Sequence, residues 1–311
     1  MSFIYLRKGC SLAAAFILTI CTFSVSAQNW EESNKKVLAE IRDGQYPAAV
    51  QSAKISRDLA AKEFGMTHTN YICSLHNLAS ARFMLGQTDA ARFDYLQSIK
   101  IAAAAYGQTE EIFAIGLYRL ADVNQSMGDL KKAETLYKQA LPILEKANDD
   151  PSEHYVNCLK NMGNLYHKQN NNLQAEEYLI KVIQTHEKKE NLNIDEYSTS
   201  LHELANLYKG TWRYDEAEEL FQKVINLRKD QFGILHPDYA EVLHDLGNLY
   251  ELQKKYEDAE RLYMEALKIK ERQLVEQRKQ DSITKVIKEQ NRILAERRND
   301  SIAKVEEQQR K

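Results

Sequence analysis

The sequence is poor in the residues that make tight turns, since only 11 glycines and 4 prolines occur among its 311 residues. β-Sandwiches and loop-rich enzymes need frequent turns, so this scarcity argues against both classes. Long apolar runs are missing after residue 27, and no later stretch is apolar enough to span a bilayer. The formal net charge of −3 lacks the basic excess of a nucleic-acid-binding protein.

Motifs that carry catalysis or bind metal ions are also missing. The sequence has no G-x-S-x-G, H-E-x-x-H, Walker A or C-x-x-C pattern. His76, His202 and His244 occupy equivalent positions in the repeat described below. Packed helices place such positions roughly 10 Å apart or more, too far to share one zinc ion. We therefore expect a protein that is not an enzyme and that needs no cofactor or metal.

The first 27 residues have the pattern of a cleaved secretory signal. Arg7 and Lys8 form a short positive segment, residues 11–25 are largely apolar, and small residues at 25–27 suit a signal peptidase. The apolar run is shorter than the roughly 20 residues of a membrane span. The sequence therefore predicts an exported chain without a transmembrane segment after cleavage. We expect it in the periplasm, with secretion or association with the outer membrane as the alternatives.

A period of 42 residues organises most of the remaining chain. One column of the repeat holds alanine in all six copies, namely Ala49, Ala91, Ala133, Ala175, Ala217 and Ala259. Another column holds large apolar residues, namely Leu78, Leu120, Met162, Leu204 and Leu246. A third is mostly aromatic, namely Tyr95, Tyr137, Leu179, Phe221 and Tyr263. Self-similarity at a fixed period of this length predicts a repeat architecture.

The spacing of apolar residues predicts two helices in each copy. In the fifth copy Leu201, Leu204 and Ala205 lie on one helical face, and Ala217 and Phe221 lie on a second. A break separates the two faces, marked by glycine in earlier copies and by a Trp-Arg pair in the fifth. Small residues in both helices allow a close crossing.

Three hexapeptides carry the resemblance to a known family. They are NMGNLY at residues 161–166, ELANLY at 203–208 and DLGNLY at 245–250. With YEDAERLY at 256–263 they resemble the tetratricopeptide repeat, in the longer form of kinesin light chain-like proteins. The resemblance covers about residues 31–271. It implies an all-α fold, a right-handed α-α superhelix of about six helix pairs with a concave groove.

The expected organisation has three parts: a signal peptide at 1–27, a solenoid at 28–271 and a charged helical tail at 272–311. The tail follows the last repeat without a glycine or proline, so the last helix is expected to run on. Its thin apolar stripe suits a weak coiled coil, which would let the protein self-associate, as well as it suits a marginal helix. A solvated helix is the alternative, and the chain is also consistent with a piece of a longer protein.

A row of polar residues on the first helices is the candidate binding site. Asn164, Asn206 and Asn248 occupy one column, which Asp122 also shares. An amide both donates and accepts hydrogen bonds, so such a row can hold the backbone of an extended peptide. Peptide-binding members of the resembled family use asparagine at this position in that way. The alternative is that these amides bond to helix carbonyls or to the next repeat.

Neighbouring columns would supply specificity. They contain the other candidate groove residues, namely His76, Tyr118, Lys160, His202, His244 and Lys209. The favoured function is an exported scaffold or adaptor that binds a peptide or helix of a partner envelope protein in its concave groove. The alternatives are a self-associating structural protein and a sensory input module of a longer signalling protein. An enzyme using His202, His244 and Lys209 is the weakest alternative.

Overall fold

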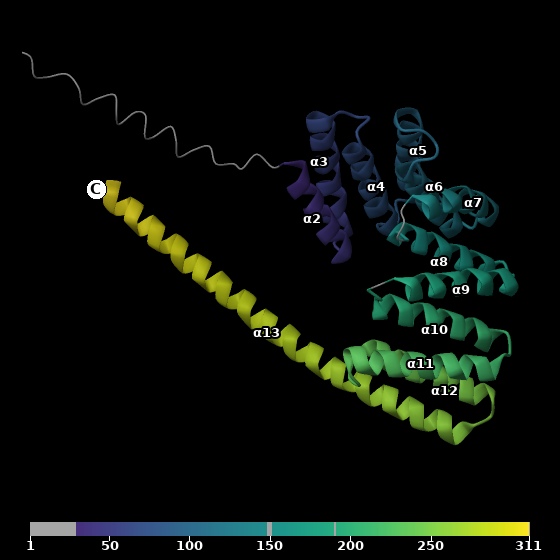
Figure 1. Ribbon diagram of the computed structural model, residues 1–311. Helices are drawn as coiled ribbons and strands as arrows, with labels where there is room; N and C mark the ends of the chain where they lie inside the picture. The colour runs from purple at the N-terminus through teal and green to yellow at the C-terminus, as the bar shows by residue number, and fades with distance from the viewer. Residues whose placement is uncertain (1–28, 148–150, 190, 311) are drawn as a thin grey trace, which may run out of the picture. The chain divides into compact units, whose positions relative to one another are not determined.

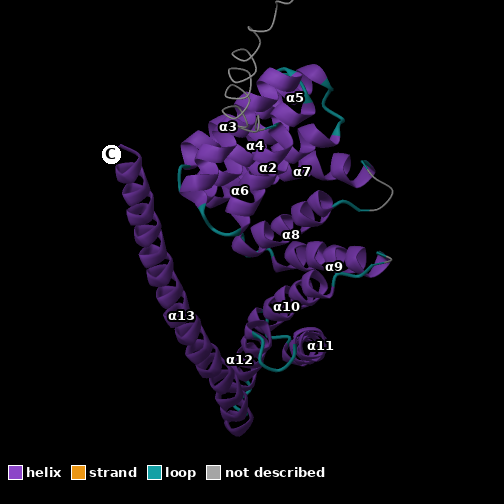
Figure 2. Cartoon of the chain, turned by 90° about the vertical axis from the view of Figure 1, so that its left-hand side faces the viewer, coloured by secondary structure: helices purple, strands orange, loops and turns teal. Residues whose placement is uncertain are grey.

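A computed structural model describes residues 29–147, 151–189 and 191–310, with side chains to residue 292 (Figure 1). Within these residues the chain forms twelve α-helices and no strand (Figure 2). Their bounds are α2 (Trp30–Arg42), α3 (Tyr46–Phe64), α4 (Thr69–Met84), α5 (Thr88–Ala105), α6 (Glu111–Ser126), α7 (Leu130–Lys146), α8 (Glu153–Lys168), α9 (Asn172–Lys188), α10 (Ile194–Gly210), α11 (Tyr214–Phe232), α12 (Pro237–Leu252) and α13 (Tyr256–Arg310). The predicted signal peptide lies outside the described residues.

The chain divides into two compact units, Met1–Leu165 and Tyr166–Lys311, with the boundary inside α8. In each unit consecutive helices pack side by side, as α6 and α7 or α12 and α13 do (Figure 1). First helices of successive pairs also touch, α4 with α6 and α10 with α12. The predicted all-α, α-α solenoid fold is confirmed.

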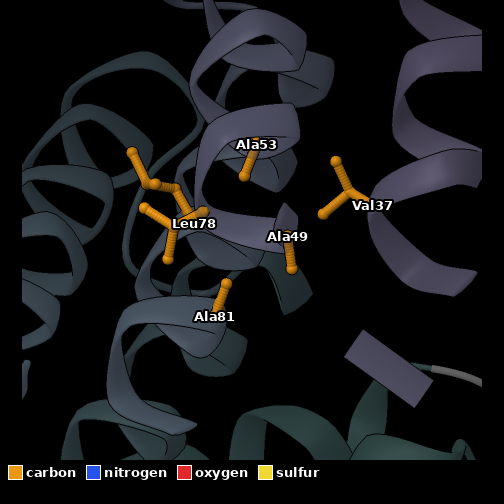
Figure 3. Packing of buried hydrophobic residues seen from close by; sticks show 6 residues of the cluster. Val37, Ala49, Ala53, Leu78 and Ala81 are labelled. Atoms are coloured by element: carbon orange, nitrogen blue, oxygen red, sulfur yellow. The ribbon is translucent and has the colours of Figure 1, made fainter. Parts of the chain in front are cut away.

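The alanine column forms the close contact within each pair. Ala49, Ala91, Ala133, Ala175 and Ala217 are completely buried. In the first unit, Val37 of α2 faces Ala49 and Ala53 of α3, and Leu78 and Ala81 of α4 pack against the same helix (Figure 3). A larger side chain in this column would push the two helices apart, because protein cores leave few voids.

A Phe-Gly-x-x-His segment links one pair to the next at two places. Gly65 and Gly233 adopt φ of 88° and 81°, values that glycine reaches without strain. Three residues later a histidine ring stacks on the preceding phenylalanine, with Phe232 and His236 centroids 4.5 Å apart. Nδ1 of His236 then accepts a hydrogen bond from the backbone N–H of Asp238 and so caps α12. The segment therefore ends one helix and starts the next.

The turn inside each pair has one residue with positive φ, always in the same column. This position is glycine in the first three copies, at Gly44, Gly86 and Gly128. In the later copies it holds the non-glycine residues Asn170, Trp212 and Lys254, with φ between 58° and 66°. Side chains larger than hydrogen cost about 1–2 kcal/mol in this region of φ and ψ. The turns of the second unit are therefore strained.

Trp212→Gly is expected to raise the free energy of unfolding by roughly 0.5–1 kcal/mol, because relief of strain exceeds the added freedom of the unfolded chain. The Trp212 side chain is 78% exposed, so little packing is lost. Urea denaturation followed by circular dichroism measures the change. The reverse control is Gly128→Ala, which should destabilise by a similar amount, since no atom lies within 4 Å of an added Cβ there. A loss of stability in Trp212→Gly would contradict the argument.

The last helix runs far beyond the final repeat, as predicted. α13 is 55 residues long. Its residues from Lys270 to Arg292 are almost all exposed, and its ion pairs there, Lys279 with Glu276 and Arg292 with Glu289, join neighbours on the same helix. Self-association through residues 272–311 stays a prediction. Within the described part, no helix is both long and apolar enough to span a bilayer.

Candidate functional site

The first unit contains three of the expected groove residues in a buried polar network. His76 of α4 and Tyr118 of α6 are buried, and Asp122 is largely buried on the same face of α6. The Tyr118 hydroxyl lies 2.9 Å from Nδ1 of His154, and the Arg119 guanidinium lies 4.9 Å from the Tyr118 ring centroid. The polar atoms of Tyr118 and Asp122 are therefore engaged by other side chains of the first unit.

Asp122 is the centre of this network. Its Oδ1 accepts hydrogen bonds of 2.6 Å from the hydroxyl of Tyr137 and from Nδ2 of Asn161. Burial nevertheless raises the pKa of Asp122 to about 6, against the opposing effect of these bonds and of the Arg119 charge. At neutral pH the carboxylate form of Asp122 therefore lowers the stability of the folded state.

His76 is the least satisfied of these three groove candidates. Its Nε2 is buried without a hydrogen-bond partner among the described residues. Burial, together with the charge of Arg119, lowers the pKa of His76 to about 3, so the ring is neutral at pH 7. Gly116 leaves room for it, because a Cβ there would lie 3.3 Å from this nitrogen. The histidine is therefore a buried neutral ring.

In the second unit, four expected groove residues meet at one aspartate. Asp245 of α12 accepts from Nε2 of His202 at 2.7 Å and from Nζ of Lys209 at 3.2 Å. The amides of Asn206 and Asn248 approach the same carboxylate at 3.5 and 3.4 Å. The cluster joins α10 to α12 on the face where these first helices touch.

Charge holds Asp245 in its ionised form. Although burial acts to raise the pKa of Asp245, the hydrogen bond from His202 and the charge of Lys209 hold it well below its usual range. The Lys209 ammonium also lies 5.5 Å from the Phe221 ring centroid. The cluster is thus a fixed array of donors around one anion, in which His202 is buried and Lys209 and Asp245 remain partly exposed.

The asparagines of this column differ in whether a tyrosine hydroxyl is available to bind them. That depends on the residue that stands 15 positions later in the sequence. At Asn248 that residue is Tyr263, whose hydroxyl donates to Oδ1 of Asn248 at 2.7 Å. The same arrangement joins Ser80 to Tyr95 at 2.7 Å. The residue 15 positions after Asn206 is Phe221, which has no hydroxyl. The side chain of Asn248 is therefore tied to its own repeat. Among the described residues, the side chain of Asn206 makes just the long hydrogen bond of 3.5 Å to Asp245.

The remaining candidates lie at the surface or partly buried. Asn164 and Lys160 are half-buried on α8, and Lys160 interacts with neighbouring groups. Leu179 stands 15 positions after Asn164, so this column again lacks a hydroxyl there. His244 is exposed, and its ring lies 5.2 Å from that of Tyr263. Of the column formed by His76, Tyr118, Lys160, His202 and His244, only Lys160 and His244 are not buried.

The prediction from sequence did not name Asp245, which organises the second unit's cluster. Its column reads Asn77, Arg119, Asn161, Glu203 and Asp245, which are two amides, one base and two acids. A column without a shared chemistry gives no signal from periodicity. The available signal was charge, since Asp245 is an acid on the first helix of the repeat that follows the repeat containing His202 and Lys209.

No metal site is evident in the described part of the chain, where no group of three or more histidine, cysteine or acidic side chains is arranged to hold an ion. Cys73 and Cys158 are both free thiols. What the described side chains offer is hydrogen-bond donors and acceptors on the first helices.

Comparison with known proteins identifies the repeat. The family model described as "Tetratricopeptide repeat" matches residues 113–188 and 196–272. A comparison with curated proteins gives no match. Solved structures similar to this chain include several that are distant in sequence, with identities of 14–22%.

Three solved structures illustrate the fold. BtubC (BKLC) from P. vanneervenii is 17% identical with a TM-score of 0.62, covering 79% of this chain and 92% of that one. A putative kinesin light chain with TPR-like repeats from Podosopora anserina is 22% identical with a TM-score of 0.54, covering 64% and 94%. The apo form of RapI is 15% identical with a TM-score of 0.65, covering 78% and 66%. At such identities the likeness concerns the fold.

Proposed function

Because this chain is a tetratricopeptide repeat protein, we propose that it is a non-enzymatic scaffold that holds an extended peptide or helix of a partner protein on its first helices. Repeats of this kind generally serve as protein-interaction scaffolds, and their stacking creates the long surface that such a task requires. The pattern of residues 1–27 supports export, and we place the partner in the cell envelope, most simply in the periplasm.

The observation that carries the proposal is the array of donors around Asp245. The Asp245 carboxylate fixes Lys209 and His202 through hydrogen bonds. The Asn206 amide lies on the same face and, within the described part of the chain, makes one hydrogen bond of 3.5 Å to Asp245. An amide offers two donors and two acceptor lone pairs, so most of the capacity of Asn206 is available to the backbone of a bound peptide. Preorganised polar groups lower the cost of binding, because little side-chain freedom remains to be lost.

Asn206→Ala is expected to weaken peptide binding by about 10-fold or more while leaving stability within about 0.5 kcal/mol, because few native bonds are lost. Peptides selected from a random library on residues 28–311 serve as probes, with affinity measured by fluorescence polarisation. Phe93→Ala, on the exposed surface of α5, is a control that should bind as the parent does.

Asn248→Ala provides the internal contrast. Its Oδ1 accepts from Tyr263, so its loss should destabilise the second unit by about 1 kcal/mol as well as alter the surface. Selected peptides that bind Asn206→Ala as tightly as the parent would place the site elsewhere. Capture of a partner from an envelope extract, repeated with Asn206→Ala, then tests the same surface with a natural ligand.

A further inference from the structure

The last helix of the second unit has an uncovered face. In α11, the side chains of Phe221, Ile225 and Arg228 are 0%, 7% and 3% exposed, and α12 packs against that helix. One repeat later, Leu267 of α13 is 56% exposed and Lys270 is also exposed. In the fifth copy, α12 covers this side of α11. The equivalent side of α13 is therefore left open to solvent.

We call this surface the open face and define it by Tyr263, Met264, Leu267 and Leu274. Met264, Leu267 and Leu274 are each about half exposed, and the i, i+3, i+10 spacing places them on one side of the helix. Tyr256 extends the same hollow toward the start of α13. Contiguous apolar surface of this kind marks an interaction site more often than isolated exposed residues do.

At the other end of the repeats, the first helix carries charged side chains where the fifth copy carries uncharged ones. On α2, Lys36 and Glu40 occupy the columns that hold Leu204 and Tyr208 in the fifth copy, and they form an ion pair of 3.7 Å. Packing the open face onto this helix would bury that ion pair against apolar side chains, which is costly. Head-to-tail stacking of chains is therefore disfavoured.

Charge along α13 changes sign at Leu267. Residues 256–266 carry four acids and one base, whereas residues 268–279 carry five bases and two acids. Two such helices side by side in the same direction would oppose like charges. Two antiparallel helices centred on Leu267 would oppose acidic and basic halves on both sides.

We propose that the open face binds the same face of a second copy of this chain, as an antiparallel, two-fold symmetric pair of α13 helices centred on Leu267. This arrangement brings Glu260 near Arg278 of the other copy, because both side chains are exposed on the side of α13 that carries Leu267. Because the dimer is two-fold symmetric, this charge pair forms twice. The interface is then fully used by two copies, so no larger assembly grows from it. In the dimer, α13 of each copy covers the open face of the other copy, just as α12 covers the equivalent side of α11.

The first test is the oligomeric state of the full chain by analytical ultracentrifugation over a range of concentrations. The parent is expected to be a dimer, and Leu267→Lys should raise the dimer dissociation constant about 100-fold, because two leucines leave the interface. Ile283→Lys is the matched control. Ile283 is 51% exposed but lies on the opposite side of α13, so that variant should dimerise as the parent does.

The second test uses the symmetry of the pair. Glu260→Lys and Arg278→Glu should each weaken the dimer, because each variant places like charges opposite one another twice across the two-fold axis. An equal mixture of the two variants should form a heterodimer in which both charge pairs are restored. Far-UV circular dichroism confirms that the variants are folded, which is expected because both side chains are exposed.

Three results would overturn the proposal. They are a parent chain that is monomeric at every concentration, an unchanged dissociation constant in Leu267→Lys, and a failure of the mixed charge variants to pair. None of these results bears on peptide binding at Asn206, so the two proposals are tested separately.

Discussion

Phe221→Ala is expected to lower the free energy of unfolding of the second unit by about 3–5 kcal/mol. The ring is completely buried in α11, where it contacts His202 edge-on at 5.7 Å between centroids. Its removal loses apolar burial and leaves a cavity between two helices that the backbone fills only in part. The midpoint of urea denaturation, followed by circular dichroism in the far ultraviolet, reports the change.

The matched control for this prediction is Phe93→Ala. The Phe93 side chain is 58% exposed on α5, so its loss should change stability by no more than about 0.5 kcal/mol. Equal shifts in the two variants would mean that Phe221 is not part of the core. The Phe221 variant should also weaken peptide binding, because the ring supports both His202 and Lys209.

Asp122→Asn and Asp245→Asn are expected to change stability in opposite directions at pH 7. The folded-state pKa of Asp122, about 6, lies above its value of about 4 in an unfolded chain. Ionisation of Asp122 therefore costs the folded state up to about 3 kcal/mol at pH 7. Asparagine keeps an acceptor for Tyr137 and Asn161, so this variant should be more stable than the parent by about 1–2 kcal/mol.

The sign is reversed for Asp245, whose folded-state pKa is depressed. Its ionised form contributes stability that is present above the unfolded-state pKa and is lost only as the pH falls through the lower folded-state value. Asp245→Asn should therefore be less stable than the parent at pH 7, by about 2 kcal/mol or more, because Lys209 and His202 lose their anion.

The pH dependence separates the two variants further. Urea denaturation at pH 7 and pH 4 should show the advantage of Asp122→Asn shrinking at the lower pH, where Asp122 of the parent is protonated. The deficit of Asp245→Asn should persist at pH 4. A stabilised Asp245→Asn, or a pH-independent gain in Asp122→Asn, would contradict the assigned charge states.

The repeat was predictable because one packing problem recurs at a fixed step. Ala217 must be small and Phe221 must be large wherever two helices cross, so each column keeps its chemistry through the copies. The same logic predicted the turn positions, although not that Trp212 would adopt a φ of 66° that glycine favours. Backbone strain leaves no signal in a hydrophobic pattern, since the residue that bears it is solvent-exposed.

The polar site was less predictable, because periodicity reports what repeats share. The equivalence of Asn206 and Asn248 in the sequence conceals a difference set by Phe221 and Tyr263, one hydroxyl group apart. Asp245 gathers four expected side chains but belongs to a column with no common chemistry. Such a site depends on which single residues differ between copies, and only the fold brings those residues together.

The far half of α13 has a further consequence. At a rise of about 1.5 Å per residue, its 55 residues make a rod of roughly 80 Å. Among its described side chains the last buried one is Ile269, so farther along the helix helicity depends on local propensity and on weak ion pairs. Warming or high salt would melt that half into a flexible tether while the repeats stay folded. The end-to-end length of this segment therefore depends on temperature and salt, because these conditions set the fraction of it that is helical.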